Sequence, residues 1–243
     1  MQDTRLEDVG IADRLSQSAL HRRTMVDCQI RTFDVTDQQL LARMLEVPRE
    51  HFLPAELEQL AYSDIALLLK PAGPGEERRT LLPPLVLARL IQGAGVGSTD
   101  TVLDVGAATG YSSALLAGLA GRVVALESES PLYNALRSNL DAFGLAKVQT
   151  ILAPLAEGAP EEAPFDLIFI NGAVEANLEA LFAQLKDGGR LVAIKRLPGD
   201  PTGRAGKAVR YENIDGEKGS RILFDASAPV LEAFLQNEQF TFS

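Results

Sequence analysis

The stretch Val102–Tyr111, with the sequence VLDVGAATGY, constrains the fold of this chain more than any other feature. Apolar and β-branched residues lead into five small or short side chains, and an Ala/Leu-rich segment begins at Tyr111. This order predicts a strand, a tight turn and a helix. Small residues let a ligand approach both the backbone and the helix N-terminus. In open parallel sheets ligands bind beyond the carboxyl ends of the strands, so this turn is the first candidate binding site.

The rest of the chain after residue 80 alternates in the same manner. The apolar runs predict strands at 101–105, 122–127, 148–152, 165–170 and 191–195, and helices at 85–92, 111–119, 131–143 and 174–186. Strands that alternate with helices indicate a parallel, doubly wound sheet. Near the end, 208–214 and 221–224 flank a Gly-containing turn and predict an antiparallel hairpin at the sheet edge. The expected class is α/β, with a mostly parallel sheet and an antiparallel C-terminal edge.

The region before residue 80 has a different character. Apolar residues between 11 and 33 recur at steps of three or four, which is typical of a helix. A second helix is expected to start at Thr36, where Gln39 completes a capping-box pattern. Residues 70–79 are rich in Pro and Gly and then charged, which predicts an exposed loop. We therefore expect a helical N-terminal subdomain and loop at 1–79, followed by the ligand-binding domain at 80–243.

Composition excludes several classes of protein. With 23 Lys and Arg against 33 Asp and Glu, the net charge is −10, which disfavours nucleic acid and anionic membrane surfaces as partners. No uncharged apolar run approaches the roughly 18 residues of a membrane helix. Cys28 is the only cysteine, and neither H-E-x-x-H nor C-x-x-C occurs, so no internal disulfide and no metal site are expected. A cytoplasmic enzyme or binding protein remains.

Two acidic residues suggest what the turn binds. Glu127 ends the strand after the turn, 127 − 106 = 21 residues beyond Gly106, at the spacing of an acid that binds ribose hydroxyls. Asp104 lies beside the turn and would repel a pyrophosphate, but it would favour the ammonium and sulfonium of S-adenosylmethionine. A nicotinamide cofactor is the weaker choice. Alternatively, the glycines only make a tight turn between strand and helix.

The stretch VLDVGAATGY resembles motif I of S-adenosylmethionine-dependent methyltransferases. Between residues 25 and 197 the chain is similar to the protein-L-isoaspartate (D-aspartate) O-methyltransferase family in particular. The segments that carry this resemblance are Met25–Arg31, Val47–Pro54, Leu60–Asp64, Ala163–Asp166 and Leu185–Val192. The resemblance implies a Rossmann-like methyltransferase domain, S-adenosylmethionine as cofactor, and methyl transfer to an isoaspartyl-containing protein or peptide in protein repair. The implied cofactor-binding residues are Asp104, Gly106, Ala107, Ala108, Gly110, Tyr111, Glu127, Ser128, Pro154 and Leu155.

The chain departs from the family pattern at four places, one of which is a longer loop before Thr80. The family usually carries T-I-S-Q-P along the methyl-acceptor pocket, whereas Thr80–Pro84 places Leu82 at the catalytic serine position. An acidic G-D-G-type turn is usual at the adenine edge, whereas this chain has 153–158 without an aspartate. Ala108 replaces a usual glycine in motif I and crowds the cofactor by one methyl group. Asn171 is expected either to form the floor of the acceptor pocket or to make a turn.

These residues leave three hypotheses open. A carboxylate acceptor is ionised at pH 7 and needs no general base, so the scarcity of His does not disfavour carboxyl methylation. The first hypothesis is an isoaspartyl methyltransferase. The second keeps the cofactor but takes another carboxylate or a small molecule, because Leu82 cannot donate a hydrogen bond and Pro83 replaces the family glutamine. The third is a non-catalytic binding protein on the same scaffold. Arg78 and Arg79 could pair with a substrate carboxylate, although solvated loop charges are the favoured interpretation.

Overall fold

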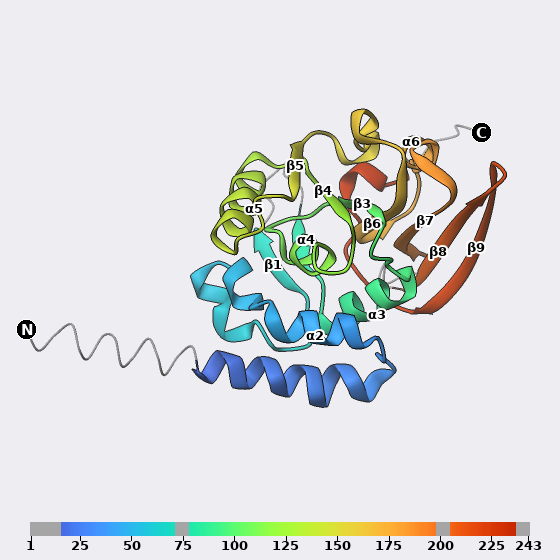
Figure 1. Cartoon of the computed structure of the whole chain (residues 1–243). Helices are drawn as coiled ribbons and strands as arrows, with labels where there is room; N and C mark the ends of the chain where they lie inside the picture. The colour runs from blue at the N-terminus through green and yellow to red at the C-terminus, as the bar shows by residue number, and fades with distance from the viewer. Residues whose placement is uncertain (1–15, 71–77, 198–204, 237–243) are drawn as a thin grey trace, which may run out of the picture.

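A seven-stranded sheet organises the computed structural model, which describes residues 16–70, 78–197 and 205–236. Its strands lie in the order β5-β4-β3-β6-β7-β8-β9 (Figure 1). The first five strands in this order run parallel, whereas β8 and β9 are antiparallel, so the predicted fold class is confirmed. The bounds are β3 (Thr101–Val105), β4 (Arg122–Glu127), β5 (Gln149–Leu152), β6 (Phe165–Val174), β7 (Leu185–Arg196), β8 (Gly206–Ile214) and β9 (Glu217–Asp225).

The central strand β6 shows why both faces of the sheet are covered. Leu167 and Phe169 face one apolar cluster, and Ile168 and Ile170 face the other. Because side chains alternate along a strand, a run that is apolar at every position needs helices on both sides. This is the physical reason why the alternating pattern produces a doubly wound sheet rather than a sheet with one face in solvent.

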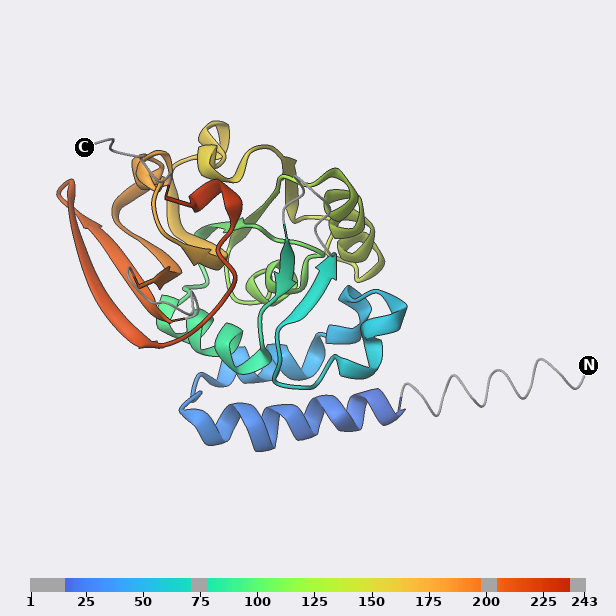
Figure 2. The same cartoon turned by 180° about the vertical axis from the view of Figure 1, so that it is seen from behind.

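The two faces are covered unequally (Figures 1 and 2). One face carries the longer helices α2 (Gln38–Glu46), α3 (Pro84–Ala94) and α5 (Ser130–Ala142), together with the short helix α4 (Tyr111–Leu116). The opposite face is covered by short elements: η5 (Leu155–Glu157), α6 (Glu179–Ala183) and η7 (Glu232–Phe234). The remaining short helices are η1 (Met25–Ile30), η2 (Arg31–Phe33), η3 (Arg49–Phe52), η4 (Ala55–Leu60) and η6 (Pro160–Glu162).

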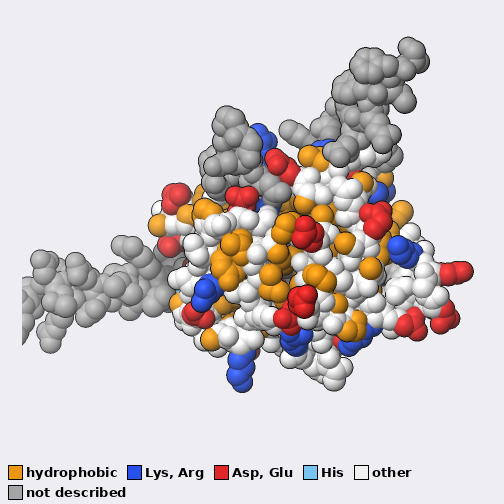
Figure 3. Space-filling model, turned by 90° about the horizontal axis from the view of Figure 1, so that it is seen from above, with side chains coloured by type: hydrophobic (Ala, Val, Ile, Leu, Met, Phe, Trp, Pro, Cys, Tyr) orange, Lys and Arg blue, Asp and Glu red, His pale blue; other side chains and the backbone are white. Residues whose placement is uncertain are grey.

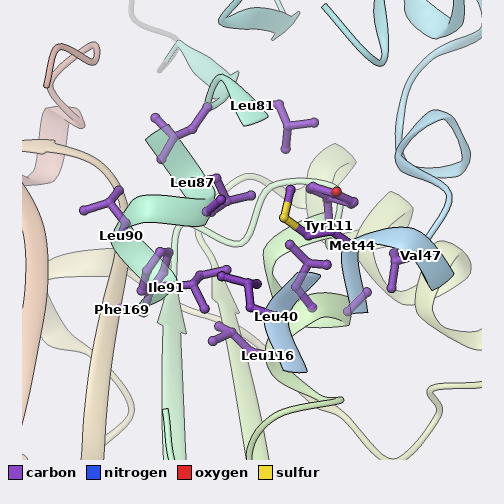
Figure 4. Packing of buried hydrophobic residues seen from close by; sticks show 14 of the residues in the cluster. Leu40, Met44, Val47, Leu81, Leu87, Leu90, Ile91, Tyr111, Leu116 and Phe169 are labelled. Carbon is purple, nitrogen blue, oxygen red and sulfur yellow. The ribbon is translucent and has the colours of Figure 1, made fainter. Parts of the chain in front are cut away.

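The N-terminal helices share their core with the sheet. Leu40 and Met44 of α2 point toward Tyr111 and toward Leu116 of α4, next to α3 side chains that reach Phe169 of β6 (Figure 4). These residues belong to one buried apolar cluster. The division into an N-terminal subdomain at 1–79 and a larger domain at 80–243 stays a prediction, and the two regions are joined by this common cluster.

A short hairpin lies where the sequence predicted only a loop. Strand β1 (Leu67–Lys70) pairs antiparallel with β2 (Arg79–Leu81), and Leu67 lies opposite Leu81. Only residues 71–77 of the predicted loop fall outside the described residues. The hairpin matters for the site, because it turns Arg79 from a loop charge into a strand residue with a fixed direction.

Three local predictions are corrected by the structure. Helix α2 is capped by Asp37, not Thr36, because the Asp37 carboxylate accepts from the N–H groups of Gln39 and Leu40. The predicted helix 174–186 shrinks to α6, since β6 extends to Val174 and β7 begins at Leu185. Asn171 does not make a turn after the strand: it lies within β6, where the register with β7 shifts between Phe169 and Ala173.

Candidate functional site

The glycine turn after β3 has the geometry that its sequence predicted. Gly106, Ala108 and Gly110 all have positive φ, at 69°, 53° and 101°. The N–H groups of Gly106 and Ala107 both donate to the carbonyl of Leu126 in β4, at 2.9 and 3.1 Å. The turn is therefore held at the carboxyl end of the sheet, between β3 and β4. Ala108 holds a left-handed conformation that disfavours residues with a Cβ.

Glu127 faces this turn, as predicted, but its carboxylate is already paired. Ala108 N–H donates to Oε2 at 2.9 Å, which orients the carboxylate toward the turn. Arg79 of β2 donates from Nε at 3.1 Å and from Nη2 at 3.0 Å to Oε1. The N–H groups of Ser128 and Glu129 also donate to Oε1. Both charged side chains are buried, at 1% exposure for Arg79 and 0% for Glu127. A ribose hydroxyl would have to compete with a buried cation for the same oxygens.

The side chain of Asp104 is fully buried, and its hydrogen-bond donors are uncharged. Its carboxylate accepts from the hydroxyls of Ser112 and Ser113, at 2.8 and 2.5 Å, and from Asn171 Nδ2 at 2.5 Å. Burial raises the pKa of Asp104 to about 6, repulsion from Glu127 adds to the rise, and the three hydrogen bonds oppose it. The structure thus brings together two residues predicted for different tasks, Asp104 and Asn171, and Asn171 holds the carboxylate in place.

Two leucines lie directly against the turn. A Cβ built on Gly106 would lie 3.4 Å from Leu231 Cδ1 and 3.7 Å from Leu155 Cδ1. One built on Gly172 would lie 2.7 Å from Leu231 Cγ. Leu155 belongs to η5, and Leu231 lies in the chain that returns after β9 across the end of β6, next to η7 (Figure 2). Leu231 is 3% exposed and Leu155 is 0% exposed, so the protein's own side chains bury the turn.

The position of the family serine has also changed its surroundings. Leu82 is buried, and its carbonyl accepts from Arg49 Nη2 at 2.7 Å. Arg49 is itself fully buried, and its guanidinium lies over the ring of Tyr111, 4.9 Å from the ring centroid. Burial lowers the pKa of Arg49. Tyr111 and Leu82 therefore contact a buried cation on the helix-rich side of the turn, and both lie in the apolar cluster there.

The other predicted cofactor residues lie around these groups. The Ser128 hydroxyl accepts from Arg79 Nη2 at 2.8 Å. Pro154 is exposed at the start of η5, directly before the buried Leu155. Gly110 leaves room for helix α5, since a Cβ there would lie 2.9 Å from Leu136 Cδ1. The predicted set is thus gathered at one end of the sheet, although its members mostly contact one another or the protein.

Sequence reasoning missed two contributors. For Arg79 the favoured interpretation, a solvated loop charge, is wrong, because the side chain is buried on Glu127; Arg78 is exposed. Leu231 was not singled out at all. An available signal was the apolar run Ala228–Leu231, which follows the last strand and needs a surface to cover.

The arrangement leaves no room for a nucleoside in the described conformation. Its ribose would need Glu127, which Arg79 holds, and the loop backbone at Gly106, which Leu231 covers. The residue types at the turn therefore match the expected cofactor, whereas the packing of Arg79 and Leu231 against them does not. Binding would require the guanidinium and the leucine to move.

The sheet order, the glycine turn and the acid at the end of the next strand define a Rossmann-like methyltransferase scaffold. Known proteins agree with this class. The family described as Protein-L-isoaspartate(D-aspartate) O-methyltransferase (PCMT) matches residues 21–205. A protein-L-isoaspartate O-methyltransferase of Koribacter versatilis is 36% identical over 178 residues, 73% of this chain and 78% of that protein. One of Methylorubrum populi is 39% identical over 181 residues, 74% of this chain and 82% of that protein.

Solved structures agree as well. A protein-L-isoaspartate O-methyltransferase superposes with a TM-score of 0.74 at 25% identity, covering 86% of this chain and 65% of that one. A Plasmodium falciparum structure described by the same activity, in complex with S-adenosyl-L-homocysteine, shares the fold with a TM-score of 0.68 at 18% identity, covering 88% and 98%. The chain belongs to the protein-L-isoaspartate (D-aspartate) O-methyltransferase family, whose members are S-adenosylmethionine-dependent O-methyltransferases. The family resemblance predicted from the sequence is confirmed.

The described residues contain neither a cluster of metal-ligating side chains nor a helix that could span a membrane. Within 16–70, 78–197 and 205–236, no group of three or more His, Cys, Asp or Glu side chains could hold a metal ion. None of the helices in these ranges is both long enough and apolar enough to span a bilayer.

Proposed function

We propose that this chain methylates the free carboxylate of isoaspartyl residues in proteins or peptides, with S-adenosylmethionine as the methyl donor. The observation that supports this most is the pairing of Ala108 N–H with Glu127 across the glycine turn, which keeps the ribose-binding acid aimed at the loop. Family membership covers this turn and the N-terminal segments as well. The cofactor-binding roles of Asp104, Gly106, Glu127 and Leu155 and the acceptor-side roles of Leu82 and Asn171 belong to this proposal.

The end of the molecule where the acceptor would arrive carries apolar patches. Figure 3 looks down on it from the top of Figure 1, and hydrophobic side chains gather in the middle of the described surface between uncharged polar side chains and backbone, with a few Asp and Glu side chains among them. Such a surface suits an extended peptide better than a polyanion. We include a cytoplasmic location in the proposal, since the single cysteine, Cys28, offers no internal disulfide of the kind that oxidising compartments favour.

The test follows transfer of radiolabelled methyl groups from S-adenosylmethionine to an isoaspartyl peptide. The matched control is the same peptide with a normal aspartate, which has a carboxylate in a different backbone setting. We expect label in the isoaspartyl peptide alone. Label in a different carboxylate, with the isoaspartyl peptide inert, would overturn the acceptor and keep the reaction, as the missing hydroxyl at Leu82 favours.

A second candidate function, cofactor-independent binding on the same scaffold, is favoured by one specific observation. The buried pair of Arg79 and Glu127 satisfies the acid without any ligand. Calorimetric titration with S-adenosylmethionine and S-adenosylhomocysteine separates the candidates. A folded protein that binds neither compound at millimolar concentration would select the binding protein, whereas saturable binding supports the enzyme.

A further inference from the structure

The chain that follows β9 is fastened across the sheet end that carries the glycine turn. We call residues 226–235 the C-terminal segment. Its carbonyl at Pro229 accepts from Ala173 N–H at 3.0 Å, and Leu231 N–H donates to the Ala173 carbonyl at 3.0 Å. Further on, the carbonyl of Phe234 accepts from Glu175 and Ala176 at 2.9 and 3.0 Å. These bonds pair the segment with the end of β6 and with the two residues that follow it, and they hold the segment in place.

The same segment contributes an apolar plug. Leu231 covers the bare backbone of Gly106 and Gly172, and Phe234 is fully buried with Leu155 in the cluster on this face of the sheet. Burying large apolar side chains such as leucine and phenylalanine stabilises the folded state. The contact is therefore a favourable part of the folded state and not a loose covering.

Arg79 closes the site by a second, chemically different contact. It enters from the hairpin β1–β2, whereas the C-terminal segment arrives from the other end of the chain. Its Nε and Nη2 donate to Glu127, and Nη2 also donates to the Ser128 hydroxyl. A guanidinium presents hydrogen-bond donors to the carboxylate, as the two hydroxyls of a ribose would. Arg79 thus occupies the polar part of the site while Leu231 occupies the apolar part.

We propose that Arg79 and the C-terminal segment act together as an intramolecular occupant of the nucleoside site, so that the cofactor binds only when both withdraw. This inference rests on the proposed function and adds a regulatory feature to it. If the open state is a small fraction of the molecules, the apparent dissociation constant rises by the inverse of that fraction. Any variant that weakens either contact then raises cofactor affinity, even though it removes a native interaction.

The test is calorimetric titration of S-adenosylhomocysteine into the full-length chain and its variants Arg79→Gln, Leu231→Ala and the double variant. Each single variant is expected to bind about tenfold more tightly than the wild type, and the double variant about 100-fold, if the two contacts add. Matched controls remove the same chemistry elsewhere. Arg190→Gln breaks the ion pair with Asp100, and Leu90→Ala removes a buried leucine of α3; neither should tighten binding.

Hydrogen exchange at the Leu231 amide supplies a readout that is independent of affinity. In the wild type at saturating S-adenosylhomocysteine, this amide should lose protection, because its bond to Ala173 breaks when the segment withdraws. Tight wild-type binding with the amide still protected and the variants unchanged would overturn the inference and leave the proposed function intact. If the wild type and all folded variants fail to bind, the proposed function fails together with the inference. Equal tightening in the two controls would also overturn the inference, since it would show general loosening.

Discussion

The carboxylates of Asp104 and Glu127 lie on neighbouring strands, at the same end of the sheet, and both are fully buried. They are stabilised by opposite means. Asp104 accepts only from neutral groups, two of which, Ser112 and Ser113, follow it by eight and nine residues. Glu127 accepts from a buried guanidinium that lies 48 residues away in the sequence. Asp104 is thus held by neutral donors alone, including Asn171 from 67 residues away, whereas Glu127 combines nearby backbone N–H groups with a buried counter-charge.

The difference also separates two kinds of role. A buried carboxylate with neutral partners can become protonated with little rearrangement, and the raised pKa of Asp104 shows this tendency. Glu127 instead forms a buried ion pair with Arg79. The position that the family resemblance assigns to ribose binding is therefore the one that carries a buried counter-charge, and this partner decides whether a ligand can reach it.

The strongest way to break the comparison is to remove the cation. In Arg79→Met, Glu127 is left buried without its counter-charge, and we expect the free energy of unfolding to fall by about 3–5 kcal/mol. Chemical denaturation at pH 7 measures the loss. The variant Arg79→Met/Glu127→Gln should recover most of it, because the backbone N–H groups can bond to the neutral amide oxygen.

A surface ion pair serves as the control for this prediction. Arg122→Met removes the partner of Glu162, where Arg122 is 42% exposed, and should cost far less than Arg79→Met, because solvent screens an exposed pair. Equal losses in Arg79→Met and Arg122→Met, or no recovery in the double variant, would show that the buried pair does not support Glu127 as described.

The second prediction uses pH to examine Asp104. Because the folded-state pKa of about 6 lies above the ordinary 3.8, the folded state holds a proton that the unfolded chain has already released between these values. The stabilising contribution is complete below pH 3.8 and is lost as pH rises through 6. The loss is about 3 kcal/mol over the whole window, about 2 kcal/mol of it between pH 4.5 and 7. In Asp104→Asn this part of the pH dependence should disappear.

Asp166 provides the matching control, since partial burial works in the other direction but hydrogen bonds from Lys186 and Thr101 lower the pKa of Asp166. Asp166→Asn should therefore leave the slope between pH 4.5 and 7 unchanged. If the free energy of unfolding of Asp104→Asn still falls between pH 4.5 and 7, the pH dependence belongs to other groups. The contrast between the two buried carboxylates would then fail.

Local pattern predicted one half of this site well. The strands β3 and β4 occur with the bounds that their β-branched runs predicted, so the turn at Gly106 and the position of Glu127 followed from sequence spacing. Periodicity and turn chemistry are short-range properties, and they fix which residues end each strand. The prediction of a helix at 174–186 was less accurate, because β6 and β7 pair over residues at both ends of this range and leave only α6 between them.

The other half could not be predicted from the same information. Whether Arg79 is exposed or buried depends on its partner Glu127 in β4. The residues next to Arg79 in the sequence carry no information about such a distant pairing. Leu231 lies 231 − 106 = 125 residues beyond the glycine it covers, and only the path of the chain after β9 brings the two together. Residues that close a site from a distance are therefore the ones that sequence reasoning overlooks, even when it identifies the residues being closed.

The prediction with the smallest expected effect concerns Ala108, whose N–H donates to Glu127 and not to Asp104. Its φ of 53° costs about 1–2 kcal/mol for a residue with a Cβ, whereas glycine loses about 0.5–1 kcal/mol through its greater freedom in the unfolded chain. Ala108→Gly should therefore stabilise by up to about 1 kcal/mol, or raise the melting temperature by about 2–4 °C. Ala107→Gly, at a neighbour without positive φ, should destabilise instead. If both changes destabilise, the left-handed conformation at Ala108 is not strained.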